Sequence, residues 1–105
     1  MAWITLFFAG LFEIGWPVGL KMAQQEQTRT LGIVVAVLCM AISGLLLWLA
    51  QKTIPLGTSY AIWTGIGATG TFLVGVLLYG DSASLGRILG VALIVAGVAT
   101  LKVAH

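Results

Sequence analysis

The sequence contains very few charged residues. Of its 105 residues, 8% are Asp, Glu, Lys or Arg, and 60% are hydrophobic. A soluble domain usually has about a quarter of its residues charged, so this composition excludes a soluble enzyme, a nucleic-acid-binding protein and a disordered chain. The only cysteine, Cys39, lies within an apolar run. One cysteine excludes a disulfide within the chain, and we predict neither a metal site nor a cofactor.

Long apolar runs occupy most of the chain instead. A helix needs about 20 apolar residues to cross the hydrocarbon core of a bilayer. Four segments have this length: Trp3–Lys21, Leu31–Gln51, Gly57–Tyr79 and Leu85–Val103. The first lacks the basic start and the cleavage pattern of a signal peptide, so we expect it to be retained. We predict an all-α membrane protein, with residues 1–105 forming a single four-helix transmembrane domain.

The basic residues are almost evenly divided between the two sides of the membrane. Four spans place both chain ends, Lys52 and Lys102 on one side, and Lys21, Arg29 and Arg87 on the other. The positive-inside rule therefore gives no firm orientation. Such a chain is either a weakly oriented monomer or a protein that inserts in both directions. Because four helices enclose little volume, we expect an oligomer.

Glu13 is the one charged residue far from a span end. A charged side chain at the bilayer centre costs at least about 2.5–3.5 kcal/mol on insertion scales, so it usually faces protein and has a function. It either joins helices as a neutral acid or alternates between binding a proton and a cation. Helical spacing places Gly10 one turn before it, leaving open space, and Trp16 one turn after it. The Trp16 ring is suited to a planar cation, and Pro17 is expected to bend the helix.

Other polar groups at membrane depth are few. Ser43 lies midway along the second span, where its hydroxyl can reach either Glu13 or a carbonyl of its own helix. In the third span, Tyr60 and Trp63 are three residues apart and share a face. They offer a hydroxyl group and a second aromatic wall beside Glu13. We predict that these three residues line a site.

Glycines mark two further features. Gly65 and Gly67, in the middle of the third span, predict either a hinge for alternating access or close helix packing. Gly86, Gly90 and Gly97 form a ridge of small residues on the fourth span. Such ridges allow helix backbones to approach closely. We predict that Gly90 and Gly97 form a dimer interface, with packing inside one chain as the alternative.

The residues considered so far also resemble a known family. The mid-helix Glu13, the run PLGTSYAIWTGIG over residues 55–67 and the chain length are similar to the small multidrug resistance family of bacterial inner-membrane exporters. The run GLFE over 10–13, followed by Trp16, and the run WTGIG over 63–67 look most like its guanidinium exporter subtype. The resemblance covers the whole chain.

The resemblance implies an antiparallel homodimer of dual topology, in which two copies of Glu13 share one site. It implies proton-coupled antiport, with Ser43, Tyr60 and Trp63 orienting the glutamates or lining the site. It also implies that Gly90 and Gly97 form the dimerisation ridge.

We therefore predict a membrane transporter, and not an enzyme, that exports guanidinium from bacteria as protons and guanidinium compete for paired Glu13 carboxylates. Its expected partners are guanidinium or related cations, protons, the lipid bilayer and a second copy or a paired related chain, but no nucleic acid. One alternative is a promiscuous exporter of quaternary-ammonium and lipophilic cations. Others are a membrane assembly protein that transports nothing and a channel that leaks protons.

Overall fold

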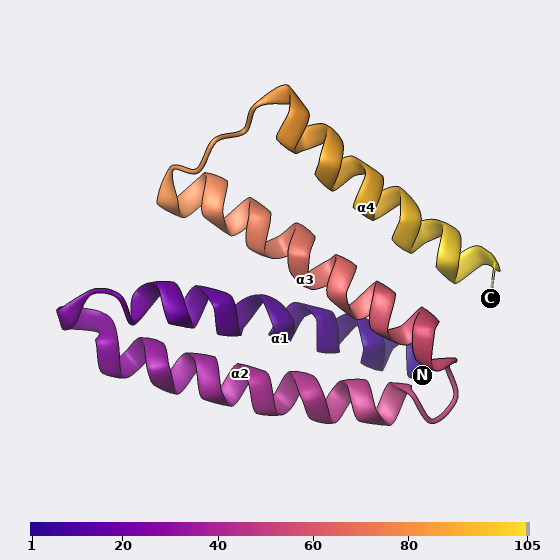
Figure 1. Cartoon of the computed structure of the whole chain (residues 1–105). Helices are drawn as coiled ribbons and strands as arrows, with labels where there is room; N and C mark the ends of the chain where they lie inside the picture. Colours follow the sequence, from indigo (N-terminus) through magenta and orange to yellow (C-terminus); the bar gives the residue numbers. More distant parts are fainter. Residues whose placement is uncertain (105) are drawn as a thin grey trace.

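The computed structural model describes residues 1–104, which are almost entirely helical (Figure 1). Its elements are α1 (Ala2–Met22), the short 3-10 helix η1 (Glu26–Thr28), α2 (Arg29–Ala50), α3 (Leu56–Tyr79) and α4 (Leu85–Ala104). Each of the four α-helices is long and apolar enough to cross a membrane, and residues 1–104 contain no strand. The predicted all-α membrane fold with four spanning helices is therefore confirmed.

The helix ends follow from local sequence. Pro55 has an extended backbone conformation and immediately precedes α3. A proline suits the start of a helix because its φ is fixed and it has no backbone N–H to donate to a preceding turn. Gly80 ends α3 in the left-handed region, with φ of 69°, a conformation that costs glycine little. Pro17 lies inside α1. The proline does not end that helix, which remains one element from Ala2 to Met22.

α1 and α2 run antiparallel and pack through their smallest residues (Figure 1). A methyl group placed on Gly19 of α1 would lie 2.6 Å from both the backbone nitrogen of Ala36 and the carbonyl oxygen of Gly32 on α2. Gly15 meets the side chain of Cys39 in the same way. Small residues let helices approach when lipid supplies no hydrophobic force between them, so the two backbones are in direct contact here.

α3 packs along α1, and α4 packs mainly on α3 (Figure 1). A small buried cluster at one end of the molecule, Leu6, Ala50, Ile54 and Ile62, joins the start of α1 to the end of α2 and the start of α3. By contrast, α4 has no buried residue. Most large apolar side chains on all four helices face outward, as expected where the surrounding solvent is lipid.

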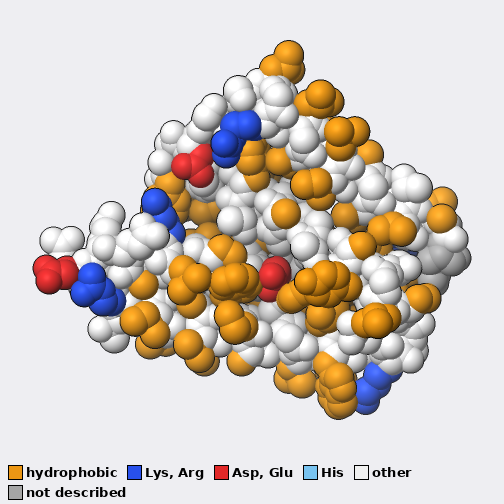
Figure 2. Space-filling view, viewed as in Figure 1, with side chains coloured by type: hydrophobic (Ala, Val, Ile, Leu, Met, Phe, Trp, Pro, Cys, Tyr) orange, Lys and Arg blue, Asp and Glu red, His pale blue; other side chains and the backbone are white. Residues whose placement is uncertain are grey.

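Basic side chains lie at the ends of the helices and contact aromatic rings there. Figure 2 shows them at the edges of the molecule, with hydrophobic side chains between them. The pairs are Lys52 with Trp48, Lys102 with Trp3, Lys21 with Tyr79 and Arg87 with Phe72, at 4.4 Å, 4.8 Å, 5.7 Å and 5.7 Å from cation to ring centroid. Such pairs anchor helix ends at the membrane interface.

The start of α1, the end of α4 and the connection over residues 51–55 lie at the same end of the molecule (Figure 1). Lys52 and Lys102 therefore belong to one side of the membrane, and Lys21, Arg29 and Arg87 to the other. The near-even division of basic residues on which the dual-orientation prediction depends is thus a property of the folded chain.

Candidate functional site around Glu13

Glu13 lies near the middle of α1, half-buried against α3. A methyl group placed on Gly67 of α3 would lie 2.5 Å from the Glu13 Cγ atom and 3.8 Å from its carboxyl carbon. Only a glycine leaves room for the glutamate at this position. Figure 2 shows an acidic patch enclosed by hydrophobic side chains, away from the charged edges. The carboxylate of Glu13 makes no hydrogen bond or ion pair with any of residues 1–104.

Gly10 does not leave open space beside Glu13, and that prediction was wrong. The position is buried, and a methyl group placed on it would lie 2.6 Å from the Ile66 Cβ atom on α3. One turn further along, Ile14 packs on Gly70. Gly10 therefore lets α3 approach α1, and the contact fixes the backbone of α3 relative to the turn that holds Glu13.

Ser43 joins three helices next to Glu13. Its side chain is fully buried, and its hydroxyl donates to the Ala9 carbonyl of α1 at 2.7 Å and accepts from the Trp63 Nε1 of α3 at 2.8 Å. Both predicted partners, the Glu13 carboxylate and a carbonyl of α2 itself, were wrong. In an α-helix the Ala9 carbonyl also accepts the backbone N–H of Glu13, four residues on. Ser43 therefore holds the turn that carries Glu13, because α1 and α2 pack closely enough to bring that carbonyl within reach.

Trp63 and Tyr60 form an aromatic pair on α3. Their ring centroids are 5.3 Å apart, with the planes tilted by 49°. Because the Trp63 indole N–H is committed to Ser43, the ring can offer a ligand its face but not its donor. Tyr60 is 55% exposed and so faces away from the rest of the chain. Trp16 is half-buried, and among residues 1–104 it has no ring contact with Tyr60 or Trp63.

We expect Ser43→Ala to weaken the fold by about 1–3 kcal/mol, because two hydrogen bonds between helices are lost and each is worth about 0.6–1.7 kcal/mol in a membrane protein. The free energy of unfolding, followed by tryptophan fluorescence during titration with a denaturing detergent, measures the change. Thr64→Val is the matched control, since the Thr64 hydroxyl bonds only to the Tyr60 carbonyl of its own helix, at 2.7 Å. Equal losses in the two variants would show that Ser43 does not join the helices.

The sequence matches the Small Multidrug Resistance protein family over residues 1–94. This chain belongs to that family. A guanidinium exporter from Yersinia pseudotuberculosis serotype I (strain IP32953) is 51% identical over 104 residues, which cover 99% of each chain. A guanidinium exporter from Salmonella typhimurium (strain LT2) is 51% identical over 102 residues, 97% of this chain and 96% of its own. One from Proteus vulgaris is 47% identical over 104 residues, 99% of each chain.

Four spanning helices and membership of the small multidrug resistance family make the chain a multi-pass membrane protein, in agreement with the predicted location in the bacterial inner membrane. The four helices α1 to α4 account for nearly all of residues 1–104. The site must therefore be built from the helices themselves.

The glycines of α3 in this small multidrug resistance protein are packing positions. α3 is an unbroken helix, in which Gly65 lies beneath Val98 of α4 and Gly67 beneath Glu13. The predicted hinge at Gly65 and Gly67 stays a prediction, whereas the alternative of close packing is observed. The contact between Gly67 and Glu13 was not predicted from the sequence. A glycine shows that a side chain is absent, but not which neighbouring residue occupies the space.

The glycines of α4 behave differently. A methyl group placed on Gly90 or Gly97 would have no atom of the described chain within 4 Å. Ile94 and Val98 of the same helix contact α3 at Gly65. Within residues 1–104 the glycine ridge is thus not used for packing inside the chain, and the predicted dimer interface there remains open to test.

Proposed function

We propose that this chain is a proton-coupled guanidinium exporter of the bacterial inner membrane, built as a single four-helix domain that works as an antiparallel homodimer. One observation carries the proposal. Glu13 is a carboxylate at mid-membrane depth that is seated against Gly67 and unpaired among residues 1–104. Relatives that are 51% identical are guanidinium exporters, and guanidinium matches such a carboxylate.

Guanidinium is a planar cation whose N–H groups form paired hydrogen bonds with a carboxylate. In the proposed dimer, one Glu13 from each protomer faces a shared site of low dielectric. Two ionised carboxylates repel each other strongly there, and either a proton or a guanidinium ion relieves the repulsion. Because the two cations compete for the same oxygens, protons entering the cell displace guanidinium leaving it.

The aromatic residues complete the proposed site. Ser43 holds the Trp63 indole by its N–H, so the ring presents a π face to which a planar cation is attracted. Tyr60 lies beside Trp63 and supplies a hydroxyl on the exposed side of α3. Trp16, one turn from Glu13 on α1, supplies a further ring. We propose that Trp16, Tyr60 and Trp63 line the cation site and that Ser43 positions Glu13 through the Ala9 carbonyl.

Two copies inserted in opposite directions supply alternating access, as in other transporters built from inverted units. The near-even division of basic residues supports dual insertion. The open glycine ridge at Gly90 and Gly97 supports contact between α4 helices of two copies. In the same scheme the glycines of α3 at Gly65 and Gly67 act as the hinge.

Currents recorded from proteoliposomes test the proposal. We expect guanidinium to evoke a current that depends on the protein, and tetraphenylphosphonium, a bulky lipophilic cation, to evoke little or none, because it has no N–H groups to donate to the Glu13 carboxylates. Protein-free liposomes are the control. A strong preference for tetraphenylphosphonium would indicate a promiscuous lipophilic-cation exporter. No current with either cation would indicate a membrane assembly protein, and a proton leak without substrate would indicate a channel.

A further inference from the structure

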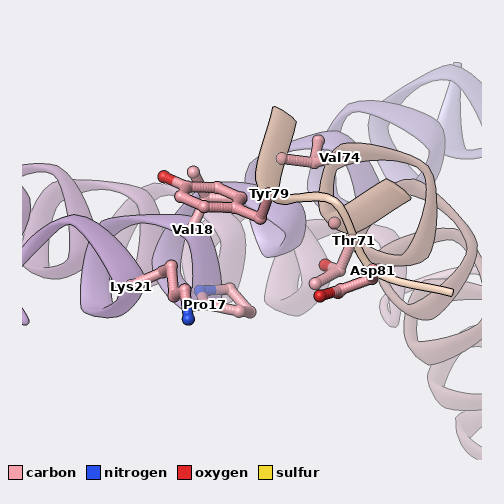
Figure 3. Close-up of a pocket in the computed structure, with 8 residues that line it drawn as sticks. Pro17, Val18, Lys21, Thr71, Val74, Tyr79 and Asp81 are labelled. Carbon is pink, nitrogen blue, oxygen red and sulfur yellow. The ribbon is translucent and has the colours of Figure 1, made fainter. Parts of the chain in front are cut away.

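A cavity with charged and polar residues in its lining lies at the opposite end of α1 from the chain start. It has a volume of about 200 Å³ and is formed by the last turns of α1 and α3 and the segment that follows α3 (Figure 3). Lys21 and Tyr79 line it close to the helix ends, where residues meet the lipid headgroups. Pro17, Val18 and Val74 give it apolar walls. The cavity is separate from the Tyr60–Trp63 pair and is not explained by the proposed transport site.

The cavity carries one charge of each sign, and these are not paired with each other. The Lys21 Nζ atom lies 5.7 Å from the centre of the Tyr79 ring. The Asp81 carboxylate packs over Gly75, and the backbone N–H of Asp81 donates to the Gly75 carbonyl at 3.0 Å. Figure 3 shows Lys21 on one side of Pro17, and Asp81 with the Thr71 hydroxyl on the other. Within residues 1–104, no ion pair joins Lys21 to Asp81.

We propose that this cavity binds the headgroup of a zwitterionic phospholipid that carries a primary ammonium, the phosphoethanolamine class. The lipid phosphate pairs with the Lys21 ammonium, and the lipid ammonium donates to the Asp81 carboxylate and the Thr71 hydroxyl. Charge-assisted hydrogen bonds of this kind are the stronger ones in proteins. A lone cation such as guanidinium matches only the Asp81 wall and is repelled by Lys21, whereas a lone phosphate matches only the Lys21 wall.

A lipid fits the surroundings better than a soluble phosphoester does. The apolar side chains Val18 and Val74 form part of the cavity wall. Leu77 and Leu78, next to Tyr79 on α3, are 77% and 73% exposed and offer a surface for acyl chains. The headgroup also needs hydrogen-bond donors on its nitrogen to reach Asp81 and Thr71. A trimethylated choline headgroup has none.

Lipid retention by the full-length protein tests this proposal. The protein is purified from vesicles with equal amounts of phosphatidylethanolamine, phosphatidylcholine and phosphatidylglycerol that share the same acyl chains, and retained lipid is counted by native mass spectrometry. We expect phosphatidylethanolamine to be enriched over both others. Asp81→Asn and Lys21→Gln should each lower that enrichment by about fivefold, as expected for one partly exposed charge contact. Glu26→Gln and Arg87→Gln, at the same membrane side but outside the cavity, should leave it unchanged.

Several results would overturn the proposal. Equal retention of ethanolamine and choline lipids would exclude recognition of the ammonium, and enrichment of phosphatidylglycerol would identify an anionic-lipid site instead. Displacement of the lipid by an equal concentration of soluble glycerophosphoethanolamine would identify a soluble ligand. If a cavity variant fails to elute as a single species, the wild-type lipid panel decides alone. The proposal does not depend on transport, because guanidinium currents and lipid retention are measured separately.

Discussion

Replacing Glu13 by glutamine is expected to abolish guanidinium-driven proton movement while the protein stays folded. Glutamine has nearly the same shape, so it keeps the contact with Gly67, but it cannot release or bind a proton in the transport cycle. It also loses the charge that pairs with guanidinium, and a hydrogen bond to a charged group is worth about 1.5–3 kcal/mol. Both halves of the exchange fail together. A pH-sensitive dye inside proteoliposomes measures the proton movement after guanidinium is added.

Glu26→Gln is the matched control for this experiment. Glu26 begins η1, is exposed and lies in the connection between α1 and α2, so the same chemical change there should leave the proton signal intact. A signal that persists in Glu13→Gln would contradict the exchange mechanism and restore the alternative in which Glu13 only joins helices. That alternative further expects the variant to keep its oligomeric state and its function, which separates it clearly from a transport defect.

The sequence was sufficient to predict the four spanning helices because the signal is large and local. About 20 apolar residues in a row have few other structures available in a bilayer, and Pro55 and Gly80 mark the ends of α3 with residues suited to those conformations. The position of Glu13 deep within a span was predicted equally directly, because a charged residue in such an apolar run is unusual.

The contacts of the site were harder to predict, for a specific physical reason. Gly10 was expected to leave space, but the sequence cannot say that Ile66, 56 positions later, fills it. Ser43 was expected to bond to Glu13 or to its own helix. Its acceptor is the Ala9 backbone carbonyl, a group that every residue carries and that no side-chain pattern reveals. Both errors concern which helix faces which, a property of packing between segments that are distant in the chain.

Replacing Gly90 and Gly97 by leucine is expected to separate the dimer without unfolding the protomer. A Cβ atom at either position would meet no atom of the described chain beyond its own stretch of helix within 4 Å, so we expect the helices of one copy to be unaffected. Across a close α4 contact, however, two added leucines force the backbones apart. Overpacking costs about 1–3 kcal/mol at each site, so the two substitutions together weaken the dimer by at least about 2 kcal/mol, or about thirtyfold. Energy transfer between differently labelled copies in bilayers, measured over a range of protein-to-lipid ratios, gives the dissociation constant.

Gly44→Leu is the control for this dimer prediction, because Gly44 is also exposed with no atom within 4 Å but lies on α2. Lipid accepts a leucine there, so the dimer should be unaffected. If the α4 variants dimerise as the wild type does, the interface lies elsewhere. If they become monomers and still exchange guanidinium for protons, one Glu13 is enough and the shared two-carboxylate site is wrong. Loss of the dimer and of transport together is the result that links the open ridge on α4 to the paired carboxylates on α1.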